Sequence, residues 1–302
     1  MKEKVLEWGG EIEVNKTIVE VVPSESKVID SDGREYPYND LIWAADLKTL
    51  YRILKRTGLD ARTLEKVNVE SHRKLSSRGA ESVFILYLGV NRPPSFFRQH
   101  GGEHLFYTPS RQGLGATNHE ERVRLIEEFD RWSKSEILAW VEKFLRLNTF
   151  EISVPVLRDP SLAPEGQTGV MVSCLFDYQI IKKAEESGWY DEFKAFCENC
   201  MIQILSETLY KQIDQDILFK FSATPLTIQK IAGSSEGAIT GWSFETPPPV
   251  ISTLKDIPKS VLTPISNIYQ AGQWAYSPAG VPIAMLTGWY AAQNIIKQAK
   301  KK

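Results

Sequence analysis

The stretch NIYQAGQWAYSPAGVPIAMLTGWYAAQNIIK, from Asn267 to Lys297, decides how the rest of the chain is interpreted. Its pattern predicts a short buried strand over 267–271, a tight loop rich in Gly, Ser and Pro, and a long helix. Pro282 suits the first turn of that helix, where a backbone N–H is not needed. Prolines and glycines interrupt the stretch too often for a membrane span. We therefore expect a buried strand–loop–helix unit whose helix start presents N–H groups and a partial positive charge.

Small residues recur along one face of this helix. Ala284, Gly288 and Ala292 lie four residues apart, so that face can approach backbone or a planar ligand closely. By spacing alone, the stretch also fits any α/β protein that ends in a buried strand and an Ala-rich helix.

The stretch resembles the C-terminal signature of FAD-dependent oxidoreductases of the phytoene desaturase, carotenoid isomerase and retinol saturase type, within the flavin amine oxidase superfamily. The matching residues are Tyr269, Ala271, Gly272, Trp274, Pro278, Gly280, Val281, Pro282, Ala284, Gly288, Ala291 and Ala292. The resemblance implies that Gly272 and Gln273 approach the pyrophosphate and ribityl side of FAD. Many relatives have an acidic residue where this chain has Gln273. The resemblance also implies that the helix start faces the flavin, through Gly280, Val281, Pro282 and Ala284.

The first part of the chain predicts short strands before a buried one. The opening decapeptide has the pattern of a helix that stops at Gly9-Gly10, and Asp32-Gly33 is a tight-turn signal. Asp46 is placed to cap a helix over about 47–57. The strands that the pattern predicts cover residues 11–14, 18–22, 27–31, 35–38 and 41–45.

The same order of motifs occurs in the oxidoreductases named above. Their central part has a GGEI segment, an N-x-x-V strand and a DG turn, followed by a D-x-V-I-x-A-x-D strand, here 40–46. The resemblance implies that Ile18 lies in the strand that meets the adenine. It also implies that Ala44 and Ala45 end a strand close to the cofactor. A generic β-meander followed by a parallel strand is the alternative interpretation.

The middle of the chain has a different pattern and predicts an α+β substrate domain. Its DPSLAPEG segment, Asp159–Gly166, resembles a segment of the same oxidoreductases. Trp242, Trp274 and Tyr276 are candidates for the aromatic wall of a substrate tunnel, and ordinary core aromatics are the alternative. The pattern predicts strands over 81–90, 105–108, 150–156 and 169–176, and helices over 120–132, 135–147, 190–211 and 226–231.

The predicted fold class is therefore α/β plus α+β. It combines a partial FAD/NAD(P)-binding Rossmann-like domain, with the architecture of GDP-dissociation inhibitors (GDI-like), and an inserted mixed-sheet substrate domain. The predicted boundaries are 1–62 and 253–302 for the two parts of the FAD-binding domain, and 63–252 for the substrate domain.

The chain contains no G-x-G-x-x-G turn, the motif that holds the pyrophosphate in dinucleotide-binding folds. In the family that turn precedes the GGEI segment. We therefore expect the C-terminal portion of such an enzyme, which binds FAD weakly or not at all alone. Self-association or a missing N-terminal segment would then complete the site.

Composition and charge narrow the possible classes of function and location. The 302 residues carry a net charge of -2, which gives no support for nucleic-acid binding. The three cysteines, two of them in Cys197-x-x-Cys200, suggest packing thiols in a reducing compartment. Gly101-Gly102 separates His100 from His104, so we predict no metal site. No signal peptide or membrane span is predicted. We expect a cytoplasmic protein, and the basic end leaves room for peripheral membrane contact.

Three functions remain open from the sequence. The first is an FAD-dependent desaturase, dehydrogenase or isomerase acting on C–C bonds of a small hydrophobic, lipid-like or carotenoid-like substrate. The second is a non-catalytic lipid- or prenyl-binding module of GDI-like fold. The third is an inert fragment. The retained helix start favours the first function, and the missing glycine turn favours the second for this chain.

Overall fold

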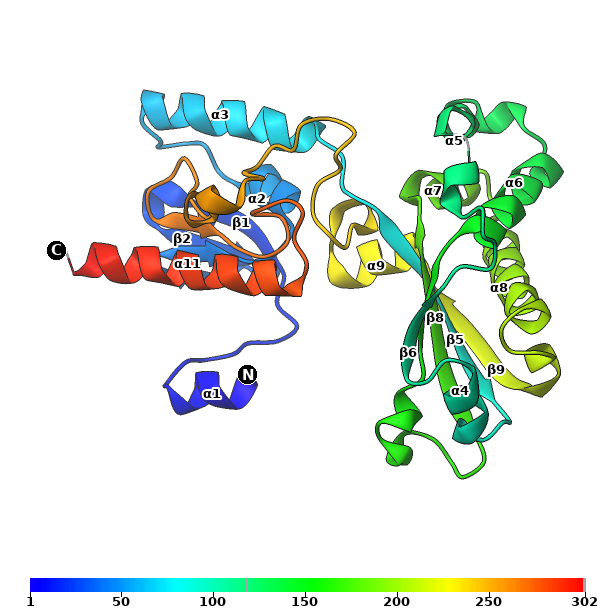
Figure 1. The fold of residues 1–302 in the computed structure, drawn as a ribbon. Coiled ribbons are helices and arrows are strands. Elements are labelled where there is room, and N and C mark those ends of the chain that lie inside the picture. Colours follow the sequence, from blue (N-terminus) through cyan, green and yellow to red (C-terminus); the bar gives the residue numbers. More distant parts are fainter. Residues whose placement is uncertain (118, 301–302) are drawn as a thin grey trace. The chain divides into compact units, whose positions relative to one another are not determined.

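The chain folds as two units in a computed structural model, which describes residues 1–117 and 119–300 (Figure 1). Unit 1 combines Met1–Gly79 with Thr240–Lys302, and unit 2 is the contiguous segment Ala80–Ile239. The units divide the chain after Gly79 and after Ile239, whereas the boundaries expected from the sequence follow residues 62 and 252. Helix α3 (Ala61–Ser76) packs on α2 (Leu47–Ile53), which places it in unit 1.

Unit 1 begins with a helix that precedes a small antiparallel sheet. Helix α1 (Lys2–Glu7) ends before Gly9, whose φ of 78° is the left-handed conformation that glycine tolerates. The predicted strand over 11–14 is wrong, because the segment pairs with no strand in the described ranges and Val14 is 71% exposed. The sheet has the order β1–β2–β3, with β1 (Ile18–Val22), β2 (Lys27–Asp30) and β3 (Glu35–Pro37).

The second sheet of unit 1 joins segments from far apart in the sequence. Strand β4 (Leu41–Trp43) pairs in parallel with β10 (Ile268–Gln270), and each is shorter than predicted. The long predicted helix follows as α11 (Val281–Ala299), and α10 (Ile257–Ser260) precedes β10. The predicted cap of α2 is confirmed, since the Thr49 N–H donates to Asp46 Oδ1 at 2.7 Å.

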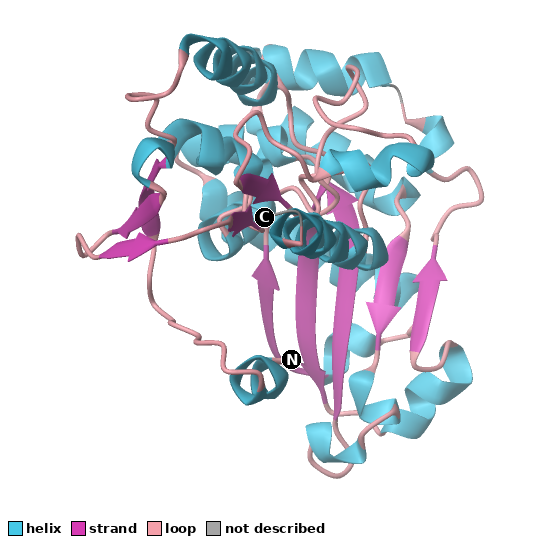
Figure 2. Cartoon of the chain, turned by 90° about the vertical axis from the view of Figure 1, so that its left-hand side faces the viewer, coloured by secondary structure: helices cyan, strands magenta, loops and turns pink. Residues whose placement is uncertain are grey.

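Unit 2 is built on a five-stranded sheet, whose long strands lie side by side in Figure 2. Each described strand pair is antiparallel, a more regular arrangement than the predicted mixed sheet. The order is β6 (His104–Tyr107), β7 (Phe150–Ser153), β8 (Thr168–Phe176), β5 (Ser82–Val90) and β9 (Ile217–Ala223).

Helices cover one face of this sheet, where alternate strand residues such as Phe84 and Val172 are fully buried (Figure 1). The cysteines belong to this core, and burial raises the pKa of Cys174 and of Cys200 to about 12. This is the packing role that the sequence predicted for Cys197 and Cys200. The α-helices of unit 2 are α4 (Pro94–His100), α5 (His119–Glu127), α6 (Lys134–Leu147), α7 (Tyr178–Glu186), α8 (Tyr190–Glu207) and α9 (Pro225–Ala232).

Candidate functional site

The carboxyl ends of β4 and β10 meet at one edge of unit 1. Because the strands are parallel, Trp43 lies opposite Gln270, and the residues after each strand emerge together. Ala44 and Ala45, after β4, are both exposed. This is the position at which open parallel sheets bind ligands, and two small residues leave it uncovered.

Gly272 forms the turn that follows β10. Its φ of 89° requires glycine, and a Cβ added there would lie 3.6 Å from the Ala44 carbonyl oxygen. The Gly272 N–H donates to Thr287 Oγ1 at 2.9 Å, and that hydroxyl donates to the Ala284 carbonyl at 2.7 Å. Thr287 is fully buried. The turn is therefore fastened to the first turns of α11 by a side chain that the sequence analysis did not single out.

The start of α11 is open. Gly280 is the N-cap residue, and no side chain in the described part of the molecule caps it. Pro282 lies in the first turn, as predicted, and Val281 is 73% exposed. A helix start without a cap offers backbone N–H groups and partial positive charge to a ligand.

A segment from 240 to 242 braces the loop between β10 and α11. A Cβ added at Gly241, whose φ is 89°, would lie 2.3 Å from the Gln273 carbonyl oxygen. Trp242 Nε1 donates to the Trp274 carbonyl at 2.9 Å. The Ser277 hydroxyl donates to the Trp242 carbonyl at 3.2 Å. Contacts within the protein therefore support the shape of this loop.

Most of the predicted cofactor residues lie at the strand edge or at the start of α11. Ala44, Ala45 and Gly272 lie at the carboxyl edge of the strand pair, and Gly280 to Ala284 form the start of α11. Gln273 is partly exposed in the loop. Ile18 begins β1 in the separate three-stranded sheet. The contacts of all these residues with FAD stay predictions.

The three predicted substrate residues pack in the core of unit 1. Trp242, Trp274 and Tyr276 are at most 3% exposed, and the two tryptophan rings meet edge to face at 4.7 Å. The Tyr276 hydroxyl donates to the Ser252 carbonyl at 2.9 Å. The alternative noted from the sequence, core aromatics, describes this packing, and their role in substrate contact stays a prediction.

Unit 2 also carries an apolar surface that was not predicted from the sequence. The sheet face opposite the core exposes Phe219 and Phe221 by 59% and 54%, and Phe221 stacks on Tyr87 at 4.7 Å. Phe219 lies over Gly89, where any Cβ would collide with its ring. A groove of about 340 Å³ lies here, with Met171 in its wall. The alternation of ILFKFSA, residues 217–223, could have placed both phenylalanines on one face.

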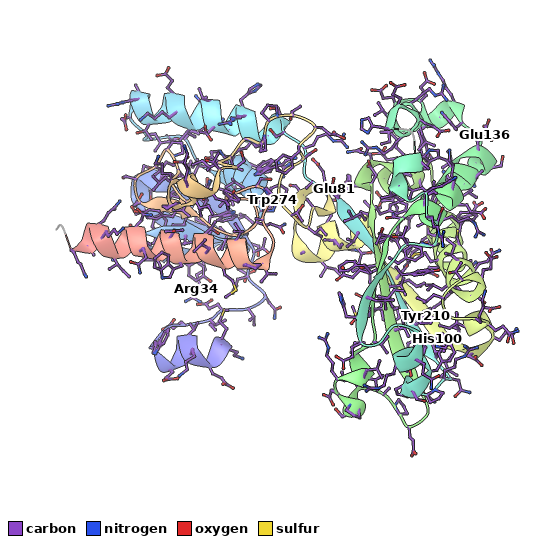
Figure 3. The ribbon with its side chains drawn as sticks, viewed as in Figure 1. Arg34, Glu81, His100, Glu136, Tyr210 and Trp274 are labelled. Atoms are coloured by element: carbon purple, nitrogen blue, oxygen red, sulfur yellow. The ribbon has the colours of Figure 1, made fainter. Side chains whose placement is uncertain are left out.

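His100 and His104 form structural contacts. His100 packs edge to face against Tyr210 in unit 2 (Figure 3) and contacts the Phe96 carbonyl through Nδ1 at 2.8 Å. His104 Nε2 lies 2.9 Å from Glu151 Oε1. Within the residues that the structure describes, no three His, Cys, Asp or Glu side chains are arranged to hold a metal ion.

Half of this chain is similar in sequence to a curated desaturase. It is 24% identical over 155 residues to 4,4'-diapophytoene desaturase (4,4'-diaponeurosporene-forming) of Staphylococcus aureus strain Newman. The match covers 50% of this chain and 29% of the desaturase, with the same values for strain USA300. A comparison with models of known protein families finds no match.

Solved oxidoreductases share the fold over nearly the whole chain. An oxidoreductase from Methanosarcina mazei aligns with a TM-score of 0.52 and 12% identity, over 95% of this chain and 52% of that one. A redesigned putrescine oxidase aligns with a TM-score of 0.54 and 11% identity, over 98% and 52%. The chain thus spans about half the length of each. Sequence similarity to a desaturase and fold similarity to these structures together confirm the predicted relationship of this chain to the oxidoreductases of the flavin amine oxidase superfamily. The fold similarity also confirms the predicted α/β Rossmann-like architecture.

Proposed function

We propose that this chain supplies the flavin-facing and substrate-facing parts of an FAD-dependent oxidoreductase acting on C–C bonds of a lipid-like or carotenoid-like substrate. The observation that carries the proposal is the open start of α11 beside the carboxyl ends of β4 and β10, held in place by the Gly272–Thr287 hydrogen bond. The residues present suit the ring end of FAD, since glycine and alanine leave room for a planar group.

The protein's own residues perform positioning in this proposal. Backbone N–H groups at the start of α11 would stabilise negative charge that develops on the flavin. Ala44, Ala45 and Gly272 would admit the ring and keep one side of it against protein. FAD, when bound, supplies the hydride-accepting chemistry. No glycine-rich phosphate turn is present in the sequence, so the residues present do not account for the pyrophosphate.

A second polypeptide segment completes the site in the proposed functional form. Strand β4 pairs with β10 alone within the described residues, and Ile42 is 37% exposed. A further strand, from a second copy or from another segment, would cover this edge and contribute the phosphate-binding turn. FAD binding by the chain alone is then weak.

The apolar sheet face of unit 2 supports a hydrophobic substrate. Phe219, Phe221 and Met171 form a surface suited to an isoprenoid or acyl chain. This observation also favours the second candidate, a lipid- or prenyl-binding module that performs no catalysis. In the described part of the chain, no helix has the length and apolarity needed to cross a membrane.

Titration with FAD, followed by flavin fluorescence quenching, tests the proposal. We expect weak saturable binding that Val281→Glu abolishes, because its carboxylate would occupy the open helix start. Ile296→Glu, which adds the same charge at an exposed site near the other end of α11, should bind FAD as the unmodified chain does.

Binding of a fluorescent retinoid or fatty acid, with Phe221→Ser as the variant, separates the two functions. Lipid binding without any flavin binding would favour the non-catalytic module. A chain that binds neither FAD nor lipid would contradict both functions and support the inert fragment.

A further inference from the structure

A groove of about 690 Å³ crosses unit 1 on the face of the β4–β10 pair away from α11. It lies between α3 and the segment 249–264, and Gln270 at the end of β10 contributes to its lining. Side chains alternate along a strand, and Tyr269 packs with Ala291 of α11, so its neighbour Gln270 points to the opposite face. The groove is therefore separate from the edge assigned to the flavin.

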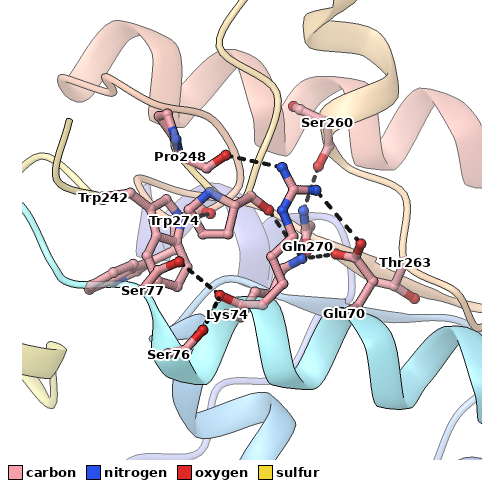
Figure 4. Close-up of polar contacts among 12 residues, drawn as sticks. Glu70, Lys74, Ser76, Ser77, Trp242, Pro248, Ser260, Thr263, Gln270 and Trp274 are labelled. Atoms are coloured by element: carbon pink, nitrogen blue, oxygen red, sulfur yellow. Dashed lines mark hydrogen bonds and ion pairs between the residues drawn. The ribbon is translucent and has the colours of Figure 1, made fainter. Parts of the chain in front are cut away.

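Gln270 brings an unpaired hydrogen-bond acceptor to this groove. Its side chain is only 5% exposed, and Nε2 donates to the Ser260 carbonyl at 2.6 Å (Figure 4). That contact fixes the orientation of the amide, because a carbonyl oxygen accepts only from the NH₂ side. Oε1 is buried and has no hydrogen-bond partner among the described residues. A buried acceptor without a donor is unfavourable, and a ligand that donates to it would relieve the cost.

Lys74 forms the charged floor of the groove. It is 3% exposed, donates to Glu70, and lies 3.4 Å from the Pro249 carbonyl oxygen (Figure 4). Its Nζ also lies 5.2 Å from the centre of the Tyr51 ring. Burial lowers the pKa of Lys74, and the contact with Glu70 opposes this shift. The ammonium is thus held by protein groups before any ligand arrives, which makes the site preorganised.

Positive charge dominates the lining. Cationic side chains outnumber acidic ones, which are Glu65 and Glu70. Arg62 and Lys66 are exposed on α3 and form no ion pair with another described residue. The cationic residues of the lining are Arg62, Lys66, Arg73, Lys74 and Lys259.

Apolar side chains complete the wall, among them Ile251 and Leu262, the latter 50% exposed. The volume falls within the range of about 300–1,000 Å³ that is typical of small-molecule sites. A ligand for this groove therefore needs a negative charge, a carbon skeleton and a hydrogen-bond donor.

We propose that this groove binds a small hydroxylated organic anion, a phosphate ester or a carboxylate, with its hydroxyl donating to Gln270 Oε1 and its charge facing Arg62 and Lys66. The hydroxyl would donate a hydrogen bond to the unpaired acceptor, and the anionic group would pair with the two cations that lack an ion-pair partner among the described residues. This inference is independent of the proposed flavin function, because it concerns other residues on another face.

Isothermal titration of the whole chain with matched probes tests the proposal. Glycerol 3-phosphate is a phosphate ester with hydroxyl groups, and ethyl phosphate is its partner without them. Gluconate is a carboxylate with hydroxyl groups, and hexanoate is its partner without them. We expect saturable binding of at least one hydroxylated probe, and binding weaker by about tenfold for its partner without the hydroxyl. Equal binding of inorganic phosphate, or no binding of any probe, would overturn the proposal.

Charge-reversal variants locate the site. Lys66→Glu should weaken binding of the hydroxylated probe by about tenfold. Lys297→Glu makes the same change at an exposed position of unit 1 outside the groove and should leave binding unchanged. Gln270→Met should remove the preference for the hydroxylated probe while retaining a response to charge. Equal effects of the two charge reversals would mean nonspecific attraction and would refute the site.

Discussion

The hydroxyl of Thr287 connects the turn after β10 to the helix that follows it, so its removal gives a sharp test of the site. Thr287→Val keeps the shape of the side chain and deletes the acceptor for the Gly272 N–H, now 2.9 Å away. The Ala284 carbonyl also loses its second donor but keeps its place in the helix. The main change is therefore one backbone N–H left without a partner.

The magnitude follows from the burial of that N–H. An unpaired buried donor costs about 1–3 kcal/mol. Gly272 itself is partly exposed, so water can reach it in part, and the lower half of that range applies. Each 1.4 kcal/mol corresponds to about a tenfold change, so the Gly272 amide should exchange with solvent roughly tenfold faster in the variant.

Hydrogen exchange measured by NMR reports this amide directly. Thr287→Ser is the matched control, because it retains the hydroxyl and loses a methyl group worth about 1 kcal/mol. We expect Thr287→Ser to keep the Gly272 amide protected even though the protein is slightly less stable. Equal protection of this amide in Thr287→Val and in the unmodified chain would show that the hydrogen bond does not hold the turn.

Other predictions concern glycines, thiols and a helix cap. Gly241→Ala should lower the free energy of unfolding by roughly 2 kcal/mol or more, since φ is 89° and the Cβ meets the Gln273 carbonyl at 2.3 Å. Gly288→Ala, with open space around the new Cβ, should raise it by about 0.5–1 kcal/mol; urea unfolding distinguishes the two signs. Cys174, with its pKa raised from 9.0 to about 12, stabilises the fold below pH 9 and loses this contribution as pH rises toward 12. Thiol labelling at mildly alkaline pH should therefore be much slower in folded than in urea-unfolded protein, and equal rates would contradict the buried thiol. Asp46→Ala should cost about 1 kcal/mol and speed amide exchange in the first turn of α2, whereas unchanged exchange there would argue against the cap.

Local signals in the sequence were sufficient to predict the strand–loop–helix unit that β10 and α11 form. Pro282 and the glycines before it mark the start of α11, and the cap at Asp46 depends on residues three apart. Such features involve neighbours in the chain, so composition and spacing predict them. The strand predicted over 11–14 failed for the opposite reason, because a strand needs backbone pairing and this segment pairs with no strand among the described residues.

Contacts between distant segments limited the prediction of the sites. The groove depends on Lys74, Ser260 and Gln270 meeting in space, and no local pattern links these positions. Helix α3 is largely polar and the predicted boundary at 62 falls in its first turn, so its assignment to unit 1 depended on its packing against α2. The alternation over 217–223 places Phe219 and Phe221 on one face of β9, but Leu218 on the other face is also 50% exposed, so the sequence alone did not distinguish the two faces.

The pairing of β4 with β10 has a consequence for synthesis on the ribosome. The residues of unit 2, Ala80–Ile239, emerge as one continuous segment and can close their sheet while translation proceeds. Strand β4 must wait for its partner, because β10 follows unit 2 in the chain. A nascent chain that terminates before Ile268 would therefore carry a folded middle and an unpaired β4, a species prone to capture by chaperones or to aggregation.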